Sequence, residues 1–366
     1  MSPRSLGAAA RSLLYQRPAL RRYTPLKGLT DNPACQWWRD PTILQPDSVW
    51  GVARTADSLN ERAAEMRALG VRLFRFEIPW WALAPTRPGG DRYDAQAARD
   101  PEWPGYQWGR LDAIVSALAA AGIQPVPMLV YAPAWSTGLA AEAGGAAAPP
   151  GDAAHTADVM TALALRYRSR VTYWELWNEP DHPHGWSDSL ARYVERVLIP
   201  GATALRETAP GRRVVLGGLA SHTNLAGLYA AGAGPYFDIA SVHYYPTRPL
   251  VRRVRGVARE TRRILDDHGD SAKPLWLTEV GVATKPPSTP SGFGGHTSER
   301  RQARFTRDLY RRVPADAICY YQLRDSAILD ADDRTLKRVY WGLSDRDGTR
   351  RKPAYEVFRA AGSSRR

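Results

Sequence analysis

The sequence predicts an α/β protein in which eight strand–helix pairs close into a (β/α)8 barrel. Short apolar runs alternate with longer amphipathic runs along most of the chain, which is typical of parallel strands joined by helices. Counting the runs gives eight strands, the number of a closed barrel. A doubly wound open sheet is the alternative, but no G-x-G-x-x-G follows the first predicted strand. This disfavours a dinucleotide-binding form of that fold.

The first part of the barrel is predicted from three apolar runs. Residues 49–53 (VWGVA) form the first strand, and residues 57–69 form a helix that ends at Gly70, a residue favoured just beyond helix ends. Residues 71–78 (VRLFRFEI) alternate in polarity with period two, as a strand does. After a helix at residues 110–121, residues 123–130 (IQPVPMLV) form an apolar third strand despite two prolines, which weaken a strand.

The same alternation continues to the C-terminus. Strands are predicted at residues 171–177, 213–219, 237–243, 274–280 and 316–322, and helices at residues 155–169, 188–208, 224–231, 251–267, 297–312 and 353–361. Two loops rich in Gly and Pro, residues 136–154 and 283–296, follow the third and seventh strands. Both loops are therefore expected on the C-terminal face of the barrel, where barrel enzymes build their sites.

Residues 1–46 fall outside this count and are expected to form a partly disordered N-terminal arm. Residues 47–366 then form the barrel domain. The most apolar long window, residues 121–135, is shorter than the about 20 residues of a membrane span, so no span is expected. Arg11 interrupts the apolar stretch of the N-terminus, and without a clear signal peptide a cytoplasmic location is expected. Secretion by an atypical start or export route stays open.

The chain has a net charge of +13, and most of its basic residues are Arg. Such a surface can attract nucleic acid, anionic lipid or an acidic polymer. Because the Arg residues are scattered along the sequence, an unspecialised basic surface is the favoured interpretation. The densest clusters, both predicted on outer helix faces, are Arg252, Arg253 and Arg255, and Arg300, Arg301 and Arg304.

No metal site and no cofactor are expected. Cys35 and Cys319 are too few for a thiolate metal site, and nothing in the sequence supports a bridge between them. His182 and His184 form an H-x-H after the fourth strand, near Asp181. An exposed or substrate-contacting loop is favoured for this pair over a set of metal ligands.

Two glutamates stand at predicted strand ends. Glu179 follows the fourth strand in WELWNEPD (residues 174–181), and Glu279 ends the seventh strand in WLTEVG (residues 276–281). Strands four and seven lie across the mouth of a closed barrel, so both carboxylates can converge on one cleft. Glycoside hydrolysis uses two carboxyl groups, and two buried like charges push their pKa values apart. A structural ion pair with Arg is the alternative for each glutamate.

These two motifs, in this order, resemble the clan of (β/α)8 retaining glycoside hydrolases whose catalytic glutamates lie on strands four and seven. Families 39 and 5 are the most similar, and the resemblance covers roughly residues 47–361. It implies a retaining hydrolase that cleaves β-glycosidic bonds of an oligo- or polysaccharide. Glu179 matches the acid/base and Glu279 matches the nucleophile.

The resemblance also implies binding residues around the two glutamates. Asn178 matches the residue that binds the sugar 2-hydroxyl, and Arg75 matches the Arg that keeps the nucleophile ionised. His243 and Tyr245, in VHYYP (residues 242–246), match a strand-six pair beside the carboxylates. A core histidine is the alternative for His243, and an interior charge partner is the alternative for Arg75. Glu77 and Glu175 are assigned no role.

Aromatic residues are candidates for the sugar subsites. Tyr131, Trp135, Trp80 and Trp81 follow the third and second strands, with packing at the rim as an equal alternative. Strand eight of the clan commonly ends in a Trp, but this sequence has YYQLRD (residues 320–325) there. Tyr321, Gln322, Arg324 or Trp341 is left to supply that surface. Trp341 belongs to a closing segment, residues 340–355, that also resembles this clan.

Two further functions stay open from the sequence. The chain can be a catalytically silent carbohydrate-binding or exopolysaccharide-assembly protein on the same fold. Its charge also permits a polyanion-binding protein, whose affinity would fall steeply with salt. A hydrolase of an acidic polysaccharide fits both the motifs and the charge. We expect a carbohydrate partner, no nucleic acid and a monomer.

Overall fold

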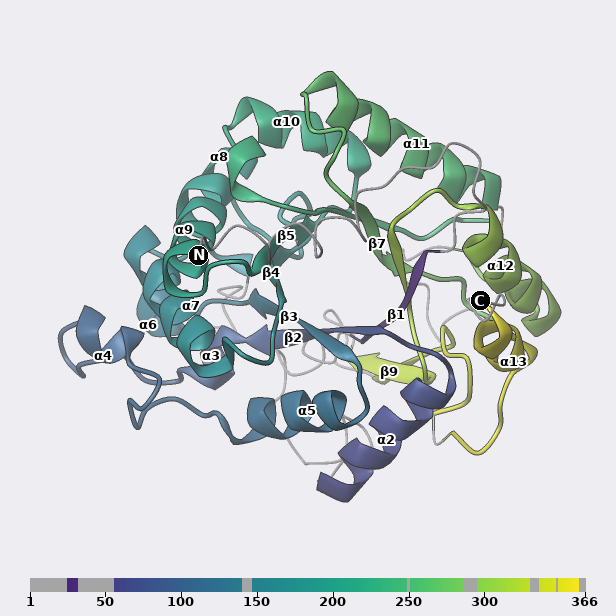
Figure 1. The fold of residues 1–366 in the computed structure, drawn as a ribbon, viewed down its shortest axis with the longest axis horizontal. Helices are drawn as coiled ribbons and strands as arrows, with labels where there is room; N and C mark the ends of the chain where they lie inside the picture. The colour runs from purple at the N-terminus through teal and green to yellow at the C-terminus, as the bar shows by residue number, and fades with distance from the viewer. Residues whose placement is uncertain are drawn as a thin grey trace, which may run out of the picture.

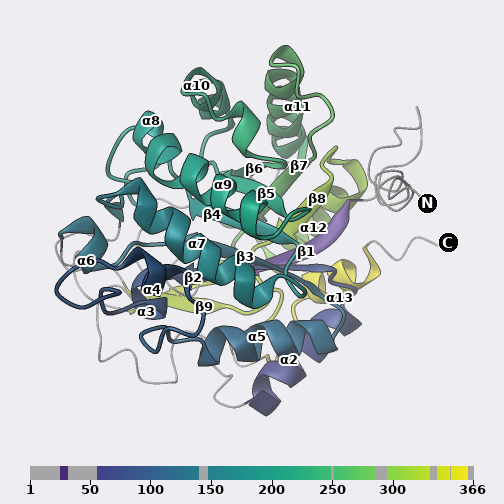
Figure 2. The same ribbon diagram turned by 60° about the vertical axis from the view of Figure 1, so that its left-hand side comes forward.

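The computed structural model describes residues 25–31, 56–139, 147–248, 251–285, 295–329, 336–346 and 348–361. Eight parallel strands form a sheet in the order β5-β4-β3-β2-β1-β8-β7-β6. Backbone hydrogen bonds from Leu216 to Ile239 and from Leu219 to Ser241 join β5 to the β6 segment. These bonds close the sheet into a barrel surrounded by helices (Figures 1 and 2). The predicted (β/α)8 fold is confirmed.

The strands lie close to the predicted runs, apart from the first. They are β1 Leu26–Asp31, β2 Leu73–Pro79, β3 Gln124–Val130, β4 Tyr173–Asn178, β5 Arg213–Gly218, β6 Ala240–Tyr244, β7 Leu275–Val280 and β8 Ala317–Tyr320. An antiparallel pair, β9 Ser326–Leu329 and β10 Leu336–Val339, follows the barrel. Because the eight barrel strands are parallel, their C-terminal ends form one mouth, which carries the loops.

The helices form a layer outside the strands. They are α2 Ala56–Ala68, α3 Trp80–Leu83, α4 Ala95–Arg99, α5 Gly109–Ala120, α6 Ala134–Thr137, α7 Ala153–Tyr167, α8 Leu190–Tyr193, η4 Val194–Leu198, α9 Ile199–Thr208, η5 His222–Asn224, α10 Leu225–Ala230, η6 Gly234–Tyr236, α11 Val251–Asp267, α12 Glu299–Arg312 and α13 Pro353–Ala360. Predicted helix 188–208 is thus a chain of three segments, α8, η4 and α9, with a π-helical centre. Among the described helices, none is long and apolar enough to cross a membrane.

The first barrel strand corrects the predicted N-terminal boundary. β1 lies inside the segment expected as an arm, and it pairs in parallel with both β2 and β8. Its sequence, LKGLTD, is too polar to be recognised as an apolar run. Gly28 of β1 pairs with β8 at a position that has no room for a side chain, because a Cβ there would lie 2.5 Å from the sulfur of Cys319. The strand predicted at residues 49–53, residues 1–24 and Cys35 lie outside the described residues, and Cys319 is a free, buried thiol.

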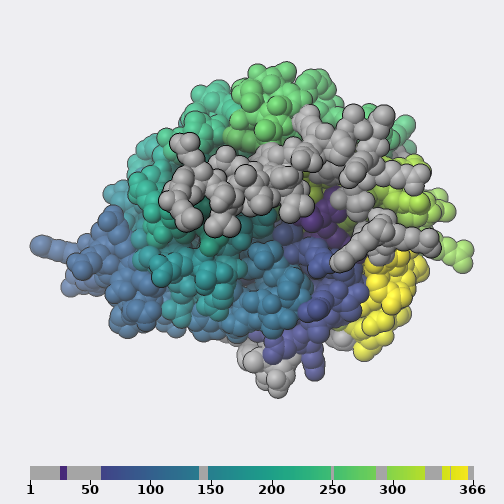
Figure 3. All heavy atoms as spheres, in the orientation of Figure 1, coloured from purple at the N-terminus to yellow at the C-terminus, as the bar shows by residue number. Residues whose placement is uncertain are grey.

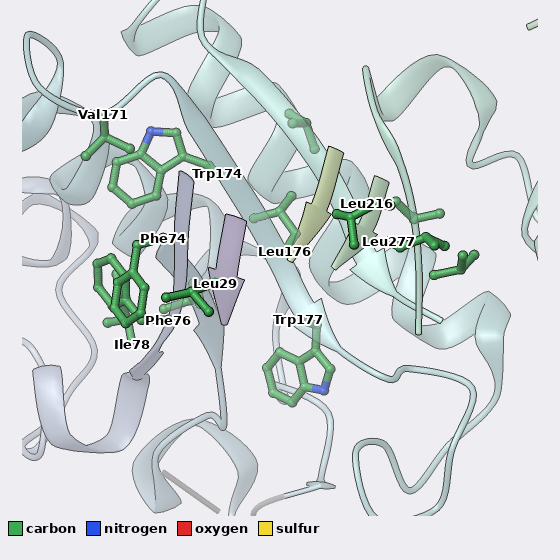
Figure 4. Packing of buried hydrophobic residues seen from close by; sticks show 14 of the residues in the cluster. Leu29, Phe74, Phe76, Ile78, Val171, Trp174, Leu176, Trp177, Leu216 and Leu277 are labelled. Atoms are coloured by element: carbon green, nitrogen blue, oxygen red, sulfur yellow. The ribbon is translucent and has the colours of Figure 1, made fainter. Parts of the chain in front are cut away.

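The main core lies between the strands and the helices. Phe74, Phe76 and Ile78 of β2 point outward into this layer, as do Trp174 and Leu176 of β4 (Figure 4). A second, smaller cluster fills the inside of the barrel at its base. Its members come from the starts of the strands: Leu73, Val126, Val215, Ile239, Trp276 and Ala317. The base is therefore closed by apolar side chains, and polar residues are concentrated nearer the mouth.

Candidate active site

Glu179 and Glu279 meet at the mouth of the barrel. A carboxylate oxygen of each, together with a ring nitrogen of His243, lies within 4.8 Å of the others. The side chain of Glu179 is 15% exposed and that of Glu279 is 5% exposed. The two carboxyl groups thus face one small space from opposite strands, as their positions in the sequence predicted.

A change of backbone conformation in β4 determines which side chains point into the barrel. Trp177 has a φ of 78° and Glu179 a φ of 46°, values that non-glycine residues seldom adopt. The indole of Trp177 packs outward against Trp186 and donates to the Gly185 carbonyl at 2.7 Å. In a regular strand, two residues three positions apart point to opposite faces. Because the alternation breaks at Trp177, Glu175 and Asn178 both point into the barrel.

Strand β7 contains a comparable irregularity. Val242 of β6 pairs with Leu277, but the next residue, His243, pairs with Glu279, so β7 has one extra residue at Thr278. The pairing of β7 with β8 shifts over the same segment. An extra residue re-aims the side chains beyond it, which is common beside active sites. Both glutamates therefore follow a local break in the regular strand pattern.

Arg75 is the centre of the charged network. It is fully buried on β2, and its guanidinium group lies between two carboxylates. Nε and Nη2 donate to both oxygens of Glu175 at 2.5 and 2.9 Å, and Nη1 donates to Oε1 of Glu279 at 2.7 Å. Burial alone would lower the pKa of Arg75, but the charges of Glu175 and Glu279 outweigh it and raise the pKa. Arg75 therefore stays charged beside Glu279.

Glu175, to which the sequence assigned no role, is a central member of the network around Arg75. It is fully buried, holds Arg75 in a bidentate pair, and accepts a third hydrogen bond from the Gly218 backbone at 2.9 Å. Glu175 and Arg75 each come two residues after an inward apolar residue of the same strand, Tyr173 and Leu73 respectively. This period-two position was the signal available in the sequence.

The amide of Asn178 and the hydroxyl of Thr30 complete the shell around Arg75. Nη2 of Arg75 donates to Oδ1 of Asn178 at 2.9 Å, which fixes the orientation of the amide. Nη1 donates to Oγ1 of Thr30 on β1 at 3.3 Å. Thr30 lies in the segment that had been predicted as an arm, so β1 contributes directly to the site.

His243 links the two glutamates. Its Nδ1 is 2.8 Å from Oε1 of Glu179, and its Nε2 is 3.7 Å from Oε1 of Glu279. Burial would lower the pKa of His243, but the charge of Glu279 and the bond with Glu179 raise it overall. Gly218 makes room for the ring, since a Cβ at that position would collide with Nε2. The imidazole is therefore fixed in place between the carboxylates.

Tyr245 binds the other oxygen of Glu279. Its hydroxyl donates to Oε2 at 2.5 Å, and burial together with the Glu279 charge raises its pKa well above the usual value. Tyr245 therefore remains a hydrogen-bond donor at neutral pH. Its ring contacts Trp341 at 4.9 Å and Tyr321 at 5.8 Å between centroids. These three rings form an aromatic wall beside Glu279.

The segment that carries Trp341 is held by a buried ion pair. Nζ of Lys352 donates to Asp325 at 2.6 Å and to Oγ1 of Thr284 at 3.0 Å. Oδ1 of Asp325 also accepts from the Gly342 backbone at 2.8 Å. These bonds tie the loops after β7 and β8 to the closing segment, and so position Trp341 next to Tyr245.

The residues at the end of β8 separate into two groups. Tyr321 joins the aromatic wall, whereas Arg324 points away from it and pairs with Glu65 of α2 and with Ser344 at 2.7 Å. The side chain of Gln322 is buried. Tyr321 and Trp341 therefore supply the aromatic surface beside Tyr245, whereas Arg324 has a structural partner.

Three other predicted aromatic residues lie at different distances from the network. Tyr131 and Trp81 share an apolar cluster with Met128, whose sulfur is 2.8 Å from Nη2 of Arg75. The hydroxyl of Tyr131 donates to Glu77 at 3.2 Å. The contacts described for Trp135 are instead with Trp80, Tyr93, His155 and the Ala84 carbonyl. Their roles in substrate binding stay predictions.

Asp181, the last residue of the fourth-strand motif, organises the neighbouring loop. Its carboxylate accepts from the backbones of Ala220 and Ser221, each at 2.8 Å, and from the Asn224 amide at 2.9 Å. The loop after β4 is thereby joined to the loop after β5. Asp181 supports the backbone that presents Glu179, and its contacts lie outside the carboxylate cluster.

The cluster of Glu179, His243 and Glu279 has the residue types of a metal site. Its atoms are close enough for a cation, but the Arg75 guanidinium already binds Glu279 on the same oxygen. Tyr245 donates to the other oxygen, so both oxygens already accept hydrogen bonds. His182 and His184 stack on the loop, at 5.0 Å between centroids, outside this cluster. The donor set fits proton transfer better than metal binding.

Comparisons with known proteins agree on the fold. No protein-family model and no curated protein matches the sequence. A glucosidase from Croceicoccus marinus superposes with a TM-score of 0.63 at 17% identity, over 82% of this chain and 63% of that one. A GH39 enzyme from Xanthomonas axonopodis pv. citri gives 0.61 at 17% identity, over 95% and 67% of the two chains.

A GH39 β-xylosidase from Caulobacter crescentus also matches, with a TM-score of 0.61 at 19% identity over 94% of this chain and 72% of that one. This chain therefore spans less than two thirds of the Croceicoccus glucosidase and somewhat more of the two GH39 structures. The chain has the barrel fold of glycoside hydrolases, including those of family 39. This confirms, for the fold, the resemblance drawn from the two glutamate motifs.

Proposed function

We propose that the protein is a retaining glycoside hydrolase that cleaves β-glycosidic bonds of an oligo- or polysaccharide. The observation that carries this proposal is the approach of the Glu179 and Glu279 oxygens to within 4.8 Å. Retaining enzymes hold their carboxyl groups about 5–5.5 Å apart, whereas inverting enzymes need about 6.5–9.5 Å to fit a water. The short separation leaves room for attack by a carboxylate but little room for an intervening water.

The surroundings of the two carboxyl groups support different roles. Glu279 accepts hydrogen bonds from Arg75 and Tyr245 on its two oxygens, which favours its ionised form and fits a nucleophile. Glu179 is more exposed, and its Oε1 lies 2.8 Å from Nδ1 of His243, within the distance of a proton transfer. This arrangement fits a group that gives up and regains a proton.

The reaction then proceeds in two displacements. Glu279 attacks the anomeric carbon while the bond to the leaving oxygen breaks, and Glu179 gives its proton to that oxygen. Water next attacks the anomeric carbon of the glycosyl-enzyme ester and gives a proton to Glu179. The ester bond breaks, Glu279 returns as a carboxylate, and the net change is hydrolysis of one glycosidic bond. Arg75 and Tyr245 stabilise the returning charge.

A panel of polysaccharides and activated aryl β-glycosides tests the proposal. The full chain should hydrolyse at least one of them, and Glu279→Gln should lose turnover on every one by at least about 1,000-fold. Glu179→Gln should lose less on aryl glycosides with acidic leaving groups, since these depart without a proton. Substantial turnover by Glu279→Gln would refute its role, and binding without any turnover would favour a silent carbohydrate-binding protein.

A further inference from the structure

The positive charge of the protein is concentrated on two neighbouring helices. α11 contains six Arg and three acidic residues, and α12 contains six Arg and two acidic residues. Their net charges of +3 and +4 make up more than half of the +13 of the whole chain. The two helices lie side by side (Figure 1), and both are at the outer edge of the molecule (Figure 3). The Arg residues of these two helices, which include the two densest clusters in the sequence, therefore lie together in the fold.

On each helix, four Arg residues follow the helical repeat. We call these two sets the Arg rows: Arg252, Arg255, Arg259 and Arg263 of α11, and Arg300, Arg304, Arg307 and Arg311 of α12. Steps of three or four residues place each set along one face of its helix, about 16 Å long, with about 5 Å between neighbours. All of these side chains are exposed except that of Arg255, which is half-buried.

Most of the Arg rows have no acidic partner in the part of the chain that the structure describes. Arg307 pairs with Asp308 at 3.0 Å, and the other seven residues form no ion pair there. Two acidic side chains of the same helices bind other residues instead: Glu299 binds Arg350, and Glu260 binds His222. Two parallel rows of uncompensated charge create a positive potential that attracts an anionic chain.

The Arg rows begin at the rim of the candidate active site. In this barrel each helix that follows a strand starts at the mouth, where the strand ends. α11 follows β6 and the segment that carries Tyr245, and α12 follows β7, which carries Glu279. Arg252 and Arg300 therefore lie at the mouth end of their helices, and the rows continue from there along the outside of the barrel. A polymer that leaves the site over β6 and β7 would meet them.

We infer that the Arg rows bind a polysaccharide that carries carboxylate or sulfate groups, and that one part of this chain enters the site. The inference rests on the proposed hydrolase function. Among the described residues, the large exposed hydrophobic side chains are Leu26, Leu139 and Leu165, none on α11 or α12. A membrane therefore finds no apolar side chain to insert there. The aromatic residues of α12, Phe305 and Tyr310, are buried, so bases of a nucleic acid find none to stack on.

The test compares two triple variants that remove the same charge. Arg259, Arg300 and Arg304, all exposed and without an ion pair among the described residues, are changed to Gln in the first variant. Arg92, Arg168 and Arg346, exposed elsewhere on the surface, are changed to Gln in the control. Gln resembles Arg in helix propensity, so the helices should persist. Both sets also carry Glu279→Gln, which prevents turnover while binding is measured.

Binding is measured by calorimetry to polygalacturonate, dextran sulfate and neutral dextran at several salt concentrations. The Arg-row variant should bind the anionic polymers roughly tenfold more weakly, with a shallower dependence on salt, and the control should change by less than about twofold. The two anionic polymers distinguish carboxylate from sulfate. Equal losses in both variants, no binding to either anionic polymer, or tighter binding to single-stranded DNA or anionic vesicles would overturn the inference.

A second readout separates this inference from the proposed function. With Glu279 intact, the Arg-row variant should hydrolyse a small aryl β-glycoside at the wild-type rate. Its KM for carboxymethyl cellulose, an anionic polymer with β-glycosidic bonds, should rise about tenfold. An unchanged KM for the polymer would contradict the inference. Polymer binding by a protein that hydrolyses no glycoside would refute the hydrolase but keep the Arg rows as a binding surface.

Discussion

The two ends of the barrel interior bury opposite kinds of side chain. The base is filled by apolar residues, such as Val126, Val215 and Trp276, which are stabilised by leaving water. The mouth contains Arg75, Glu175 and other charged groups, which lose hydration when buried and are held by one another. The base therefore supplies stability by packing, whereas the buried charges of the mouth are tolerated because they pair with one another.

The buried cation Lys27, near the base, sharpens this contrast. The ammonium group of Lys27 is buried on the outer side of β1 and donates to the Leu69 carbonyl at 2.7 Å and the Phe358 carbonyl at 2.8 Å. These carbonyls lie at the C-terminal ends of α2 and α13, where helices lack backbone partners. Arg75 neutralises carboxylates at the mouth, whereas Lys27 satisfies backbone groups that join two helices to the barrel.

Removing the cation of the mouth should have the largest effect. Arg75→Met leaves Glu175 and Glu279 buried without a positive partner, and we expect a loss of about 3–5 kcal/mol in the free energy of unfolding. We also expect at least a roughly 100-fold loss of kcat/KM. Urea unfolding and aryl glycoside turnover measure these quantities. The double variant Arg75→Met with Glu175→Gln should regain stability, and failure to do so would show that the charges are not coupled.

A substitution at the base should be as destabilising but leave the chemistry intact. Trp276 is 3% exposed and packs against Tyr173 inside the barrel. Trp276→Ala should cost about 3–5 kcal/mol through lost burial and a cavity, and Trp276→Phe should cost less. Turnover per folded molecule should stay at the wild-type value at a temperature where the variant is folded. A large loss of kcat would contradict the proposal that the base contributes to stability but not to the chemistry.

The helix-binding cation should have an intermediate effect. Lys27→Met leaves buried carbonyls without a donor and should cost about 1–3 kcal/mol. Burial, and then the charge of Arg72, lower the pKa of Lys27 to about 8 from 10.5. Between these values the unfolded chain binds more protons, so the Lys27 contribution to stability increases as the pH rises. Unfolding from pH 7.5 to 10 should show this slope in the wild type but not in Lys27→Met.

The smallest expected effect concerns the proton of His243. Its pKa is raised in the fold, so its contribution to stability is fully present below the usual value near 6.5. That contribution is lost as the pH rises through the higher value of the folded state. The stability difference between wild type and His243→Gln should therefore shrink between pH 6 and 9. A difference that grows with pH would contradict the raised pKa.

Much of this architecture was accessible from residue patterns. The apolar runs and the Gly-terminated helices between them located seven strands, because parallel strands buried on both faces are almost continuously apolar. β1 was missed because Lys27, Gly28 and Thr30 interrupt its apolar pattern, and their reasons for being there are contacts with distant residues. Such long-range contacts leave no local signal.

The site was predicted only in part, because some of its features also depend on contacts between distant residues. The glutamates are marked by motifs and strand ends, and the structure brings Glu179, Glu279, Arg75, His243 and Tyr245 together. The role of Glu175 depends on its contact with the Arg75 guanidinium, and this contact forms only when the barrel brings β2 and β4 together. The breaks at Trp177 and Thr278 are backbone irregularities, and alternation of polarity could not locate them.

The stereochemistry of hydrolysis tests the central claim most directly. Double displacement through Glu279 inverts the anomeric carbon twice, so the first product formed from a β-glycoside keeps the β configuration. Proton NMR during the first minutes, before mutarotation, distinguishes the two anomers of whichever β-glycoside is cleaved in the substrate panel. We predict that the β-anomer appears first. Initial release of the α-anomer would show single displacement by water and would contradict the nucleophilic role of Glu279.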